Sequence, residues 1–260
     1  MDNQKKWIAF YTMVRKDVIR MFRIWGQTFL PSVVTSVLYF SVFGTILGSR
    51  IGEMQGVDYM TFVVPGLVML AIVTTSYANT SFTFFSQKFF MRSVDELLVS
   101  PMPPWLIISG FVGGGIVRGV LVGILVMIVS LFFTGLSISV HNALIILSFA
   151  ILTALVFSLA GLVNGVYAKS IDAINIVPTF VLTPLVYLGG IFYSVHNLPD
   201  WWQSITYANP LFYLINGFRY GFLGITDISL SISVTILFGL IVFLVAVNWY
   251  LIRTGLGLKQ

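Results

Sequence analysis

The chain has 260 residues, of which 58% are hydrophobic and 9% are charged, with a formal net charge of +5 and no cysteine. The missing cysteine excludes disulfides and thiolate metal sites, and the apolar composition leaves little length for a soluble domain. Because the basic residues flank apolar segments, membrane lipids rather than nucleic acid are their expected partners.

Apolar segments of about 20 residues recur along the chain, which is the length a helix needs to cross a hydrocarbon layer of about 30 Å. Six are predicted to be transmembrane: 29–48, 60–87, 104–134, 143–167, 174–193 and 229–252. With a cytoplasmic N-terminus, eleven of the 14 Lys and Arg residues fall inside: Lys5, Lys6, Arg15, Lys16, Arg20, Arg23, Lys88, Arg92, Lys169, Arg253 and Lys259. This asymmetry predicts an all-α polytopic membrane protein with both termini in the cytoplasm.

Residues 4–25 are predicted to form an amphipathic helix on the membrane surface. Its apolar stripe recurs at intervals of three and four: Trp7, Tyr11, Val14, Val18, Met21 and Trp25. Lys5, Lys16, Arg20 and Arg23 gather on the opposite face. Such a helix buries its stripe at the headgroup boundary, with Trp7 and Trp25 as interfacial anchors. The alternative is an ordinary helix packed on another subunit.

The second predicted span is rich in small polar side chains: Thr74, Thr75, Ser76, Asn79, Thr80, Ser81 and Thr83. Packing between helices, or a kink, explains them because hydroxyls can bond carbonyls of the preceding turn. The functional alternative is a wetter face beside a transport pathway. Asn79 is the best candidate for that role, since its amide needs partners.

A short helix is predicted in the cytoplasmic connection 93–101. Ser93 and Glu96 fit a reciprocal N-terminal capping pattern, and Pro101 cannot continue a helix. The apolar residues of this segment are Leu97, Leu98 and Val99. The segment is either a docking surface for another protein or a connector that lies on the headgroups.

The third predicted span combines closely spaced glycines with one charge. Gly110 and Gly114, and the series from Gly115 to Gly123, favour close approach of neighbouring helices. Arg118 lies near mid-membrane, where a charge costs about 2.5–3.5 kcal/mol and must face protein or water. Arg118 is therefore either a structural group inside the bundle or part of a substrate path.

Between the fifth and sixth spans, residues 199–223 are predicted to form two half-length helices at the outer leaflet. The Asn209-Pro210 pair separates apolar segments that are too short to span. Trp201 and Trp202 are the expected interfacial anchors.

Several chemistries have no support in the sequence. The predicted spans contain no Asp or Glu, which argues against a proton- or sodium-coupled carrier. His141 and His196 are predicted in outward loops, and no catalytic residue or metal site is expected. The absence of a Gly-Lys dipeptide excludes a Walker-type phosphate loop, so any nucleotide must be bound by a different polypeptide.

Taken together, these segments resemble the ABC type-2 exporter permeases. Glu96-Leu97-Leu98-Val99-Ser100-Pro101 is similar to the coupling-helix segment of that family. The order of Leu188-Gly189-Gly190-Ile191-Phe192-Tyr193, Leu198-Pro199-Asp200-Trp201, Asn209-Pro210 and Arg219-Tyr220 resembles its signature after span five. The resemblance covers essentially the whole chain, as one transmembrane domain over 1–260.

This resemblance implies a six-span permease of the bacterial inner membrane that exports amphiphiles, including polysaccharide–lipid conjugates and hydrophobic drugs. It would pair as a homodimer with two copies of a separate ABC ATPase, which binds ATP and magnesium, and would have no cofactor or enzymatic activity of its own. The coupling helix would be 93–101, with ATPase contacts at Ser93, Asp95, Glu96, Leu97, Leu98 and Pro101. Candidate pathway or gating residues are Asn79, Arg118 and Arg219. The other classes considered are an ion-coupled carrier or channel acting without an ATPase, and a non-transporting scaffold.

Overall fold

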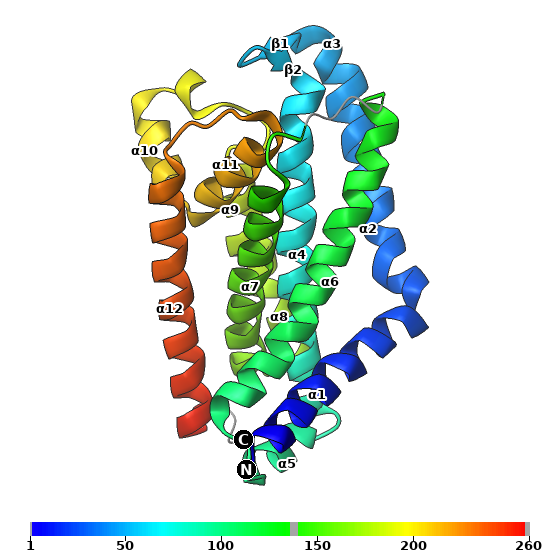
Figure 1. The fold of residues 1–260 in the computed structure, drawn as a ribbon, viewed down its shortest axis with the longest axis vertical. Coiled ribbons are helices and arrows are strands. Elements are labelled where there is room, and N and C mark those ends of the chain that lie inside the picture. Colours follow the sequence, from blue (N-terminus) through cyan, green and yellow to red (C-terminus); the bar gives the residue numbers. More distant parts are fainter. Residues whose placement is uncertain (1, 136–139, 258–260) are drawn as a thin grey trace.

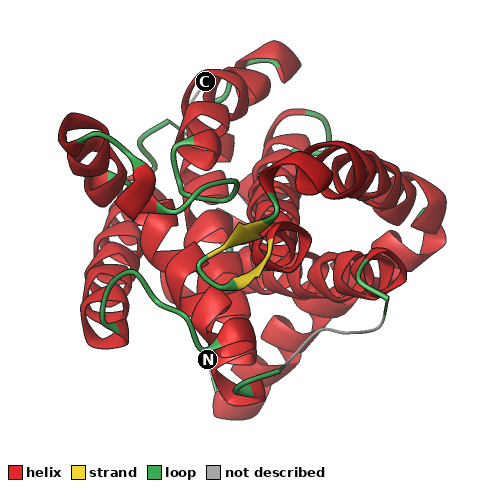
Figure 2. Ribbon diagram, turned by 90° about the horizontal axis from the view of Figure 1, so that it is seen from above, coloured by secondary structure: helices red, strands yellow, loops and turns green. Residues whose placement is uncertain are grey.

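The protein is an almost entirely helical bundle, seen here in a computed structural model that describes residues 2–135 and 140–257 (Figure 1). The long helices are α1 (Asn3–Arg23), α2 (Trp25–Tyr39), α4 (Tyr59–Phe89), α6 (Pro104–Phe133), α7 (Ala143–Tyr167) and α12 (Leu230–Thr254). The shorter helical elements are η1 (Phe40–Leu47), α3 (Gly48–Ile51), α5 (Ser93–Val99), α8 (Ile171–Val177), η2 (Pro178–Leu182), α9 (Thr183–Tyr187), η3 (Val195–Asn197), α10 (Asp200–Ala208) and α11 (Pro210–Leu223). The only strands in the described residues, β1 (Glu53–Met54) and β2 (Val57–Asp58), pair antiparallel and lie near the middle of the bundle when it is viewed from above (Figure 2).

Five helices are long and apolar enough to cross a membrane: Trp25–Gly44, Tyr59–Phe89, Pro104–Phe133, Ala143–Tyr167 and Leu230–Thr254. Each overlaps a predicted span, which confirms the all-α polytopic class. The start of α1 and the end of α12 lie at the same end of the bundle as α5 (Figure 1).

The predicted fifth span is shorter than the other five, and like the first span it contains a π-helical segment. Its helical part is shorter, Ile171–Tyr187, and is divided into α8, the π-helical turn η2 and α9. Pro178 opens the wide turn, and Thr183 donates a hydrogen bond to its carbonyl at 2.9 Å. A proline lacks an amide donor and disturbs the regular helical ladder, which explains the interruption. Residues 188–193 leave the helix, and Gly190 adopts a φ of 78°, a conformation that suits glycine.

The core forms around α4, which is buried along most of its length against α6, α7 and α11. Gly115 and Gly119 of α6 lie against Thr80 and Ser76 of α4. On another side, Gly161 of α7 faces a backbone carbonyl of α4. The close helix approach predicted from the glycine spacing of the third span is confirmed at Gly115 and Gly119.

The amphipathic stripe predicted for the N-terminal helix is divided between two environments. Val14 of α1 packs on Gly113 of α6, and Met21 is only 1% exposed. Trp7, Tyr11 and Trp25 remain exposed. The expectation of one stripe facing a single environment is therefore wrong, because the glycine face of α6 takes up one edge of it. The helix packs within its own chain.

Gly161→Ala is expected to destabilise the protein by about 1–3 kcal/mol, because the added methyl group would overlap the Tyr77 carbonyl, and helix backbone cannot easily move aside. Gly239→Ala in α12 is the matched control, since no described atom outside the adjacent backbone of its own helix lies within 4 Å of the position its Cβ would take. Its effect should stay below about 1 kcal/mol. Thermal unfolding midpoints of the two purified variants test the difference, and equal midpoints would contradict the close α4–α7 contact.

Candidate functional site

The short helix α5 stands at one end of the bundle, directly after α4 (Figure 1). Arg92 begins it with a left-handed backbone conformation, φ 52° and ψ 13°, that turns the chain sharply. Ser100 ends it in an extended conformation, as expected for a residue before proline. A two-turn helix was predicted over 93–101, and the structure has Ser93–Val99, with Pro101 beyond its end.

The predicted reciprocal cap at the start of α5 is wrong. Arg92 rather than Ser93 occupies the capping position, and no side chain caps the helix. Ser93 is the first helical residue, and its hydroxyl lies 3.5 Å from Oε1 of Gln87 in α4. The left-handed turn at Arg92 shifts the helix start by one residue, which leaves Ser93 unable to reach the free amides of the first turn.

The side chains of α5 divide into an anchor and an exposed face. Val94 is buried in a cluster with Phe84 of α4 and with residues of α6, α7 and α12, and Leu97 and Leu98 are half-buried against that cluster. Asp95 and Glu96 are exposed, and Val99 is 89% exposed. The structure thus presents Asp95, Glu96 and Val99 outward, while the two leucines hold the helix to the bundle.

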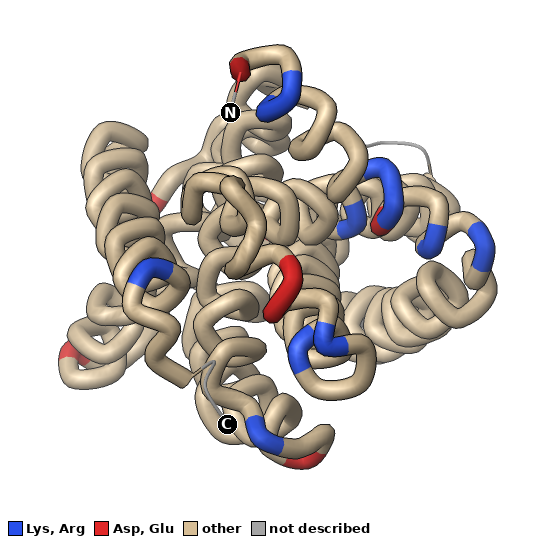
Figure 3. The backbone as a smooth tube through the Cα atoms, turned by 90° about the horizontal axis from the view of Figure 1, so that it is seen from below, with Lys and Arg blue, Asp and Glu red and all other residues tan. Residues whose placement is uncertain are grey.

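Charged residues concentrate at this same end (Figure 3). Lys88 of α4 is mostly buried there and donates hydrogen bonds to the carbonyls of Val166, at 2.6 Å, and Gly257, at 2.7 Å. The ends of α4, α7 and α12 are therefore tied together next to α5. A cation at the C-terminal carbonyls of a helix also complements its dipole.

Asn79 and Arg118 contact each other. The Arg118 guanidinium donates a hydrogen bond to Oδ1 of Asn79 at 3.1 Å, between α6 and α4. Asn79, Ser76 and Thr80 are buried in the helix interior. In this conformation the polar residues of α4 thus lie mainly at helix contacts, with Thr74 as an exposed exception.

Asp17 of α1 is a buried carboxylate that the sequence analysis did not single out. It packs against Gly114 of α6 and lies 3.7 Å from Arg20, which donates a hydrogen bond to Thr83 of α4 at 2.5 Å. Lys16 next to it donates to Gln87 at 3.0 Å. Burial raises the pKa of Asp17, while Arg20, Lys16 and Arg118 oppose that shift. The available signal was a single acid inside a basic helix, four residues before Met21.

A surface groove runs between α2, α4 and the α8–η2–α9 segment. It consists of a cavity of about 330 Å³ next to a second of about 230 Å³, and the two share Tyr39, Leu70 and Thr74. The hydroxyls of Tyr39 and Tyr187 meet at 3.4 Å across the larger cavity. The lining mixes aromatic, aliphatic and hydroxyl side chains, which suits an amphipathic molecule.

Arg219 of α11 lies in a separate cluster at the opposite end of the bundle from α5. It donates to the Gly190 carbonyl at 2.7 Å, its guanidinium lies 3.9 Å from the Phe62 ring centroid, and Asp227 is 4.0 Å away. Gln55 donates to Asp227 at 2.7 Å and to Ser194 at 2.6 Å. These contacts join α11 to the loops and hairpin around it.

The four tryptophans predicted as interfacial anchors are at or near the surface. Trp7, Trp25 and Trp201 are exposed, and Trp202 is half-buried and stacks on Trp201 with ring centroids 4.4 Å apart. Within residues 2–135 and 140–257, no three His, Asp or Glu side chains gather as a metal site would require.

Asp17→Asn is expected to weaken the pH dependence of stability in acid. Because the pKa of Asp17 is raised in the folded protein, the folded state binds this proton more tightly than the unfolded chain. The contribution of Asp17 to stability therefore falls as pH rises from its ordinary pKa through the raised one. Unfolding midpoints in detergent across this pH range should fall less for the variant, and equal slopes would contradict the burial of this carboxylate.

Comparison with known proteins identifies the family. The model described as ABC-2 type transporter matches residues 8–223. Over 254 residues the chain is 50% identical to the inner membrane transport permease YadH of Escherichia coli (strain K12), with 98% of each chain covered. It is also 25% identical over 244 residues to nodulation protein J of Neorhizobium galegae, covering 93% of this chain and 91% of that relative. The apolar helices and the YadH similarity together support a multi-pass protein of the inner membrane, and this chain belongs to the ABC-2 type transporter family.

Proposed function

We propose that this chain is the permease subunit of an ATP-driven exporter in the bacterial inner membrane. Two copies would pair with two copies of a separate ABC ATPase, which would bind ATP and magnesium. The substrate would be amphipathic: lipid-like, glycan-linked or drug-like. The observation that carries the proposal is the short helix α5, in a chain without a phosphate loop. Its tip at Val99 is exposed, and its anchor, formed by Val94, Leu97 and Leu98, packs on the bundle.

The proposed topology has six crossings, with α8, η2 and α9 as an interrupted fifth crossing. Both termini and α5 would face the cytoplasm, since the basic residues concentrate at that end (Figure 3). The half-helices α10 and α11 would then lie at the outer leaflet. α1 would lie along the inner surface with its Trp7 in the headgroup layer, together with Trp25 at the start of α2.

The packing supports a mechanical connection from α5, where the ATPase would bind, through α4 to the groove. The anchor residues Val94, Leu97 and Leu98 lie against the same cluster as Phe84 of α4 and Phe111 of α6. Force applied to the tip of α5 would therefore reach α4, and α4 also forms one wall of the groove through Thr74 and Tyr77. Movement of α4 away from α2 and α9 would widen this path, and separation of α2 from α9 would part Tyr39 from Tyr187.

The first test introduces charge at the tip of α5. Val99→Asp is expected to lower co-purification of the ABC ATPase at least about tenfold, because it places a carboxylate where an apolar contact is proposed. Val99 is preferable to Leu97 or Leu98, since those residues also pack on the bundle. Val140→Asp, an exposed valine near the start of α7, is the control and should have little effect.

A photo-crosslinking amino acid at position 99 provides an independent measurement in native membranes. The expected adduct is a protein that carries a phosphate-binding loop, and the same probe at position 140 should not form it. Normal co-purification of Val99→Asp, together with no such adduct at position 99, would overturn the assignment of α5.

The second test examines the groove without requiring the substrate. Because the chain has no cysteine, a single introduced thiol can be labelled specifically. Thr74→Cys is expected to react with a membrane-impermeant maleimide at least about tenfold faster than Val242→Cys. Val242 is an exposed residue of α12 that should face lipid, where a thiol does not ionise readily. Equal rates, with or without ATP in the complex, would exclude the groove as an aqueous path.

A further inference from the structure

A further cavity, distinct from the two that form the groove, lies between α1 and the end of α4. Its volume is about 510 Å³, and its polar lining consists of Thr12, Arg15, Lys16, Asp17, Arg20, Arg23, Ser86 and Gln87. Four basic side chains from one helix thus surround a single space. Among the residues that the structure describes, Asp17 is the one acidic residue that lines it. The charge balance of the lining therefore favours an anion.

The four cations are held to different degrees. Arg20 is positioned by Asp17 and Thr83, and Lys16 by Gln87. Arg15 and Arg23 are exposed, and neither forms an ion pair with any residue that the structure describes. Burial, with help from Arg20 and against the effect of Asp17, lowers the pKa of Lys16, so its positive charge lacks full compensation. An anion in the cavity would supply that compensation.

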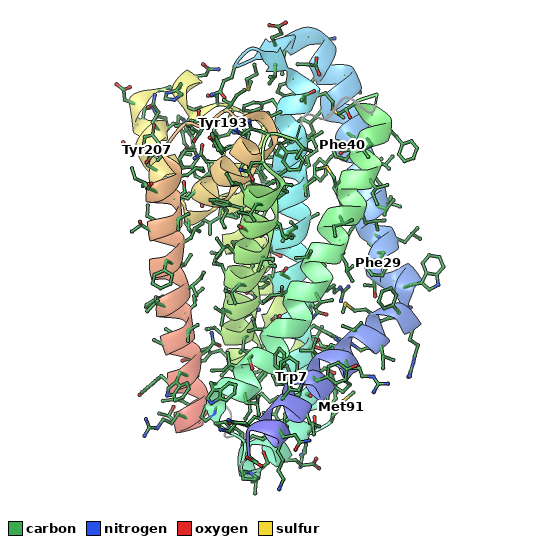
Figure 4. All side chains as sticks on the ribbon, in the orientation of Figure 1. Trp7, Phe29, Phe40, Met91, Tyr193 and Tyr207 are labelled. Carbon is green, nitrogen blue, oxygen red and sulfur yellow. The ribbon has the colours of Figure 1, made fainter. Side chains whose placement is uncertain are left out.

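The surroundings of the cavity indicate where such an anion would come from. Ile19 and Met91 also line it, and both are exposed, Met91 at 67%. Phe22 and Phe90, close to them in sequence, are exposed as well. Met91 lies beside α1 at the lower end of the bundle (Figure 4). Basic groups that continue into an exposed apolar surface match the boundary between lipid headgroups and acyl chains.

We propose that this cavity binds the phosphate of an anionic phospholipid from the inner leaflet, with the acyl chains over Ile19 and Met91. Arg15 and Arg23 would contact the phosphate from the open side, and Lys16 and Arg20 from the inner side. A lipid held here would join α1 to α4, next to the Gln87 side chain that also approaches Ser93 of α5. The site depends on the proposed position of α1 in the headgroup layer and not on ATPase coupling or transport.

The test measures lipid binding to the purified full-length chain in neutral detergent, by native mass spectrometry. Phosphatidylglycerol is the probe, with phosphatidylcholine and inorganic phosphate as comparisons. The double variant Arg15→Gln/Arg23→Gln should bind phosphatidylglycerol at least about tenfold more weakly, since each basic group near a headgroup contributes severalfold in affinity. Both residues are exposed, so the variant should fold.

The matched control is Lys5→Gln/Lys6→Gln, which removes the same charge from the same helix outside the cavity. It should retain phosphatidylglycerol within about twofold, and the wild type should prefer phosphatidylglycerol to phosphatidylcholine. Equal losses in the two double variants would overturn the proposal in favour of diffuse surface attraction. Displacement of the lipid by inorganic phosphate at similar concentration would overturn it in favour of a free-phosphate site. ATPase co-purification is a separate measurement, so failure here would not bear on the proposed function.

Discussion

The rest of the structure depends on the close packing of α4 against the glycine faces of α6 and α7. In a membrane, water cannot be expelled from between helices that already lie in lipid, so association relies on van der Waals contact and interhelical hydrogen bonds. Gly115, Gly119 and Gly161 allow the backbones to approach, and the hydroxyls of Ser76 and Thr80 are enclosed there. With α4 held this way, the groove and α5 have a common rigid support.

Two polar clusters occupy opposite ends of this support. One joins Asp17 and Arg20 of α1 to Thr83 of α4. The other surrounds Arg219 and joins α11 to Gly190 and to Asp227. A buried charge is retained only where partners satisfy it, so each cluster restrains the elements that supply those partners. The helices between them contact each other mainly through apolar and small side chains.

The N-terminal helix has one edge that packs on α6 and one edge that stays exposed, and the amphipathic pattern alone does not distinguish the two. Its inner edge, with Met13, Val14 and Asp17, fits the glycines of α6, and its outer edge keeps Trp7 and Tyr11 exposed. Because one side of α1 packs on α6 and the other side would lie in the headgroup layer, α1 would couple the position of the bundle to the membrane surface. The basic cavity lies where these two environments meet.

The sequence by itself determined the helical class, five of the six predicted spans as long apolar helices and the position of α5, because length, hydropathy and proline placement act locally. It also indicated the glycine contacts through their spacing. Only the tertiary structure decided that Asn79 and Arg118 bond each other, that Arg219 belongs to a different cluster, and that Asp17 is buried. Those outcomes depend on which residues from distant helices meet, and no local pattern encodes such pairing. The capping of α5 and the break in the fifth span also escaped prediction, since hydropathy and spacing do not encode the left-handed conformation of Arg92 or the π-helical turn that begins at Pro178.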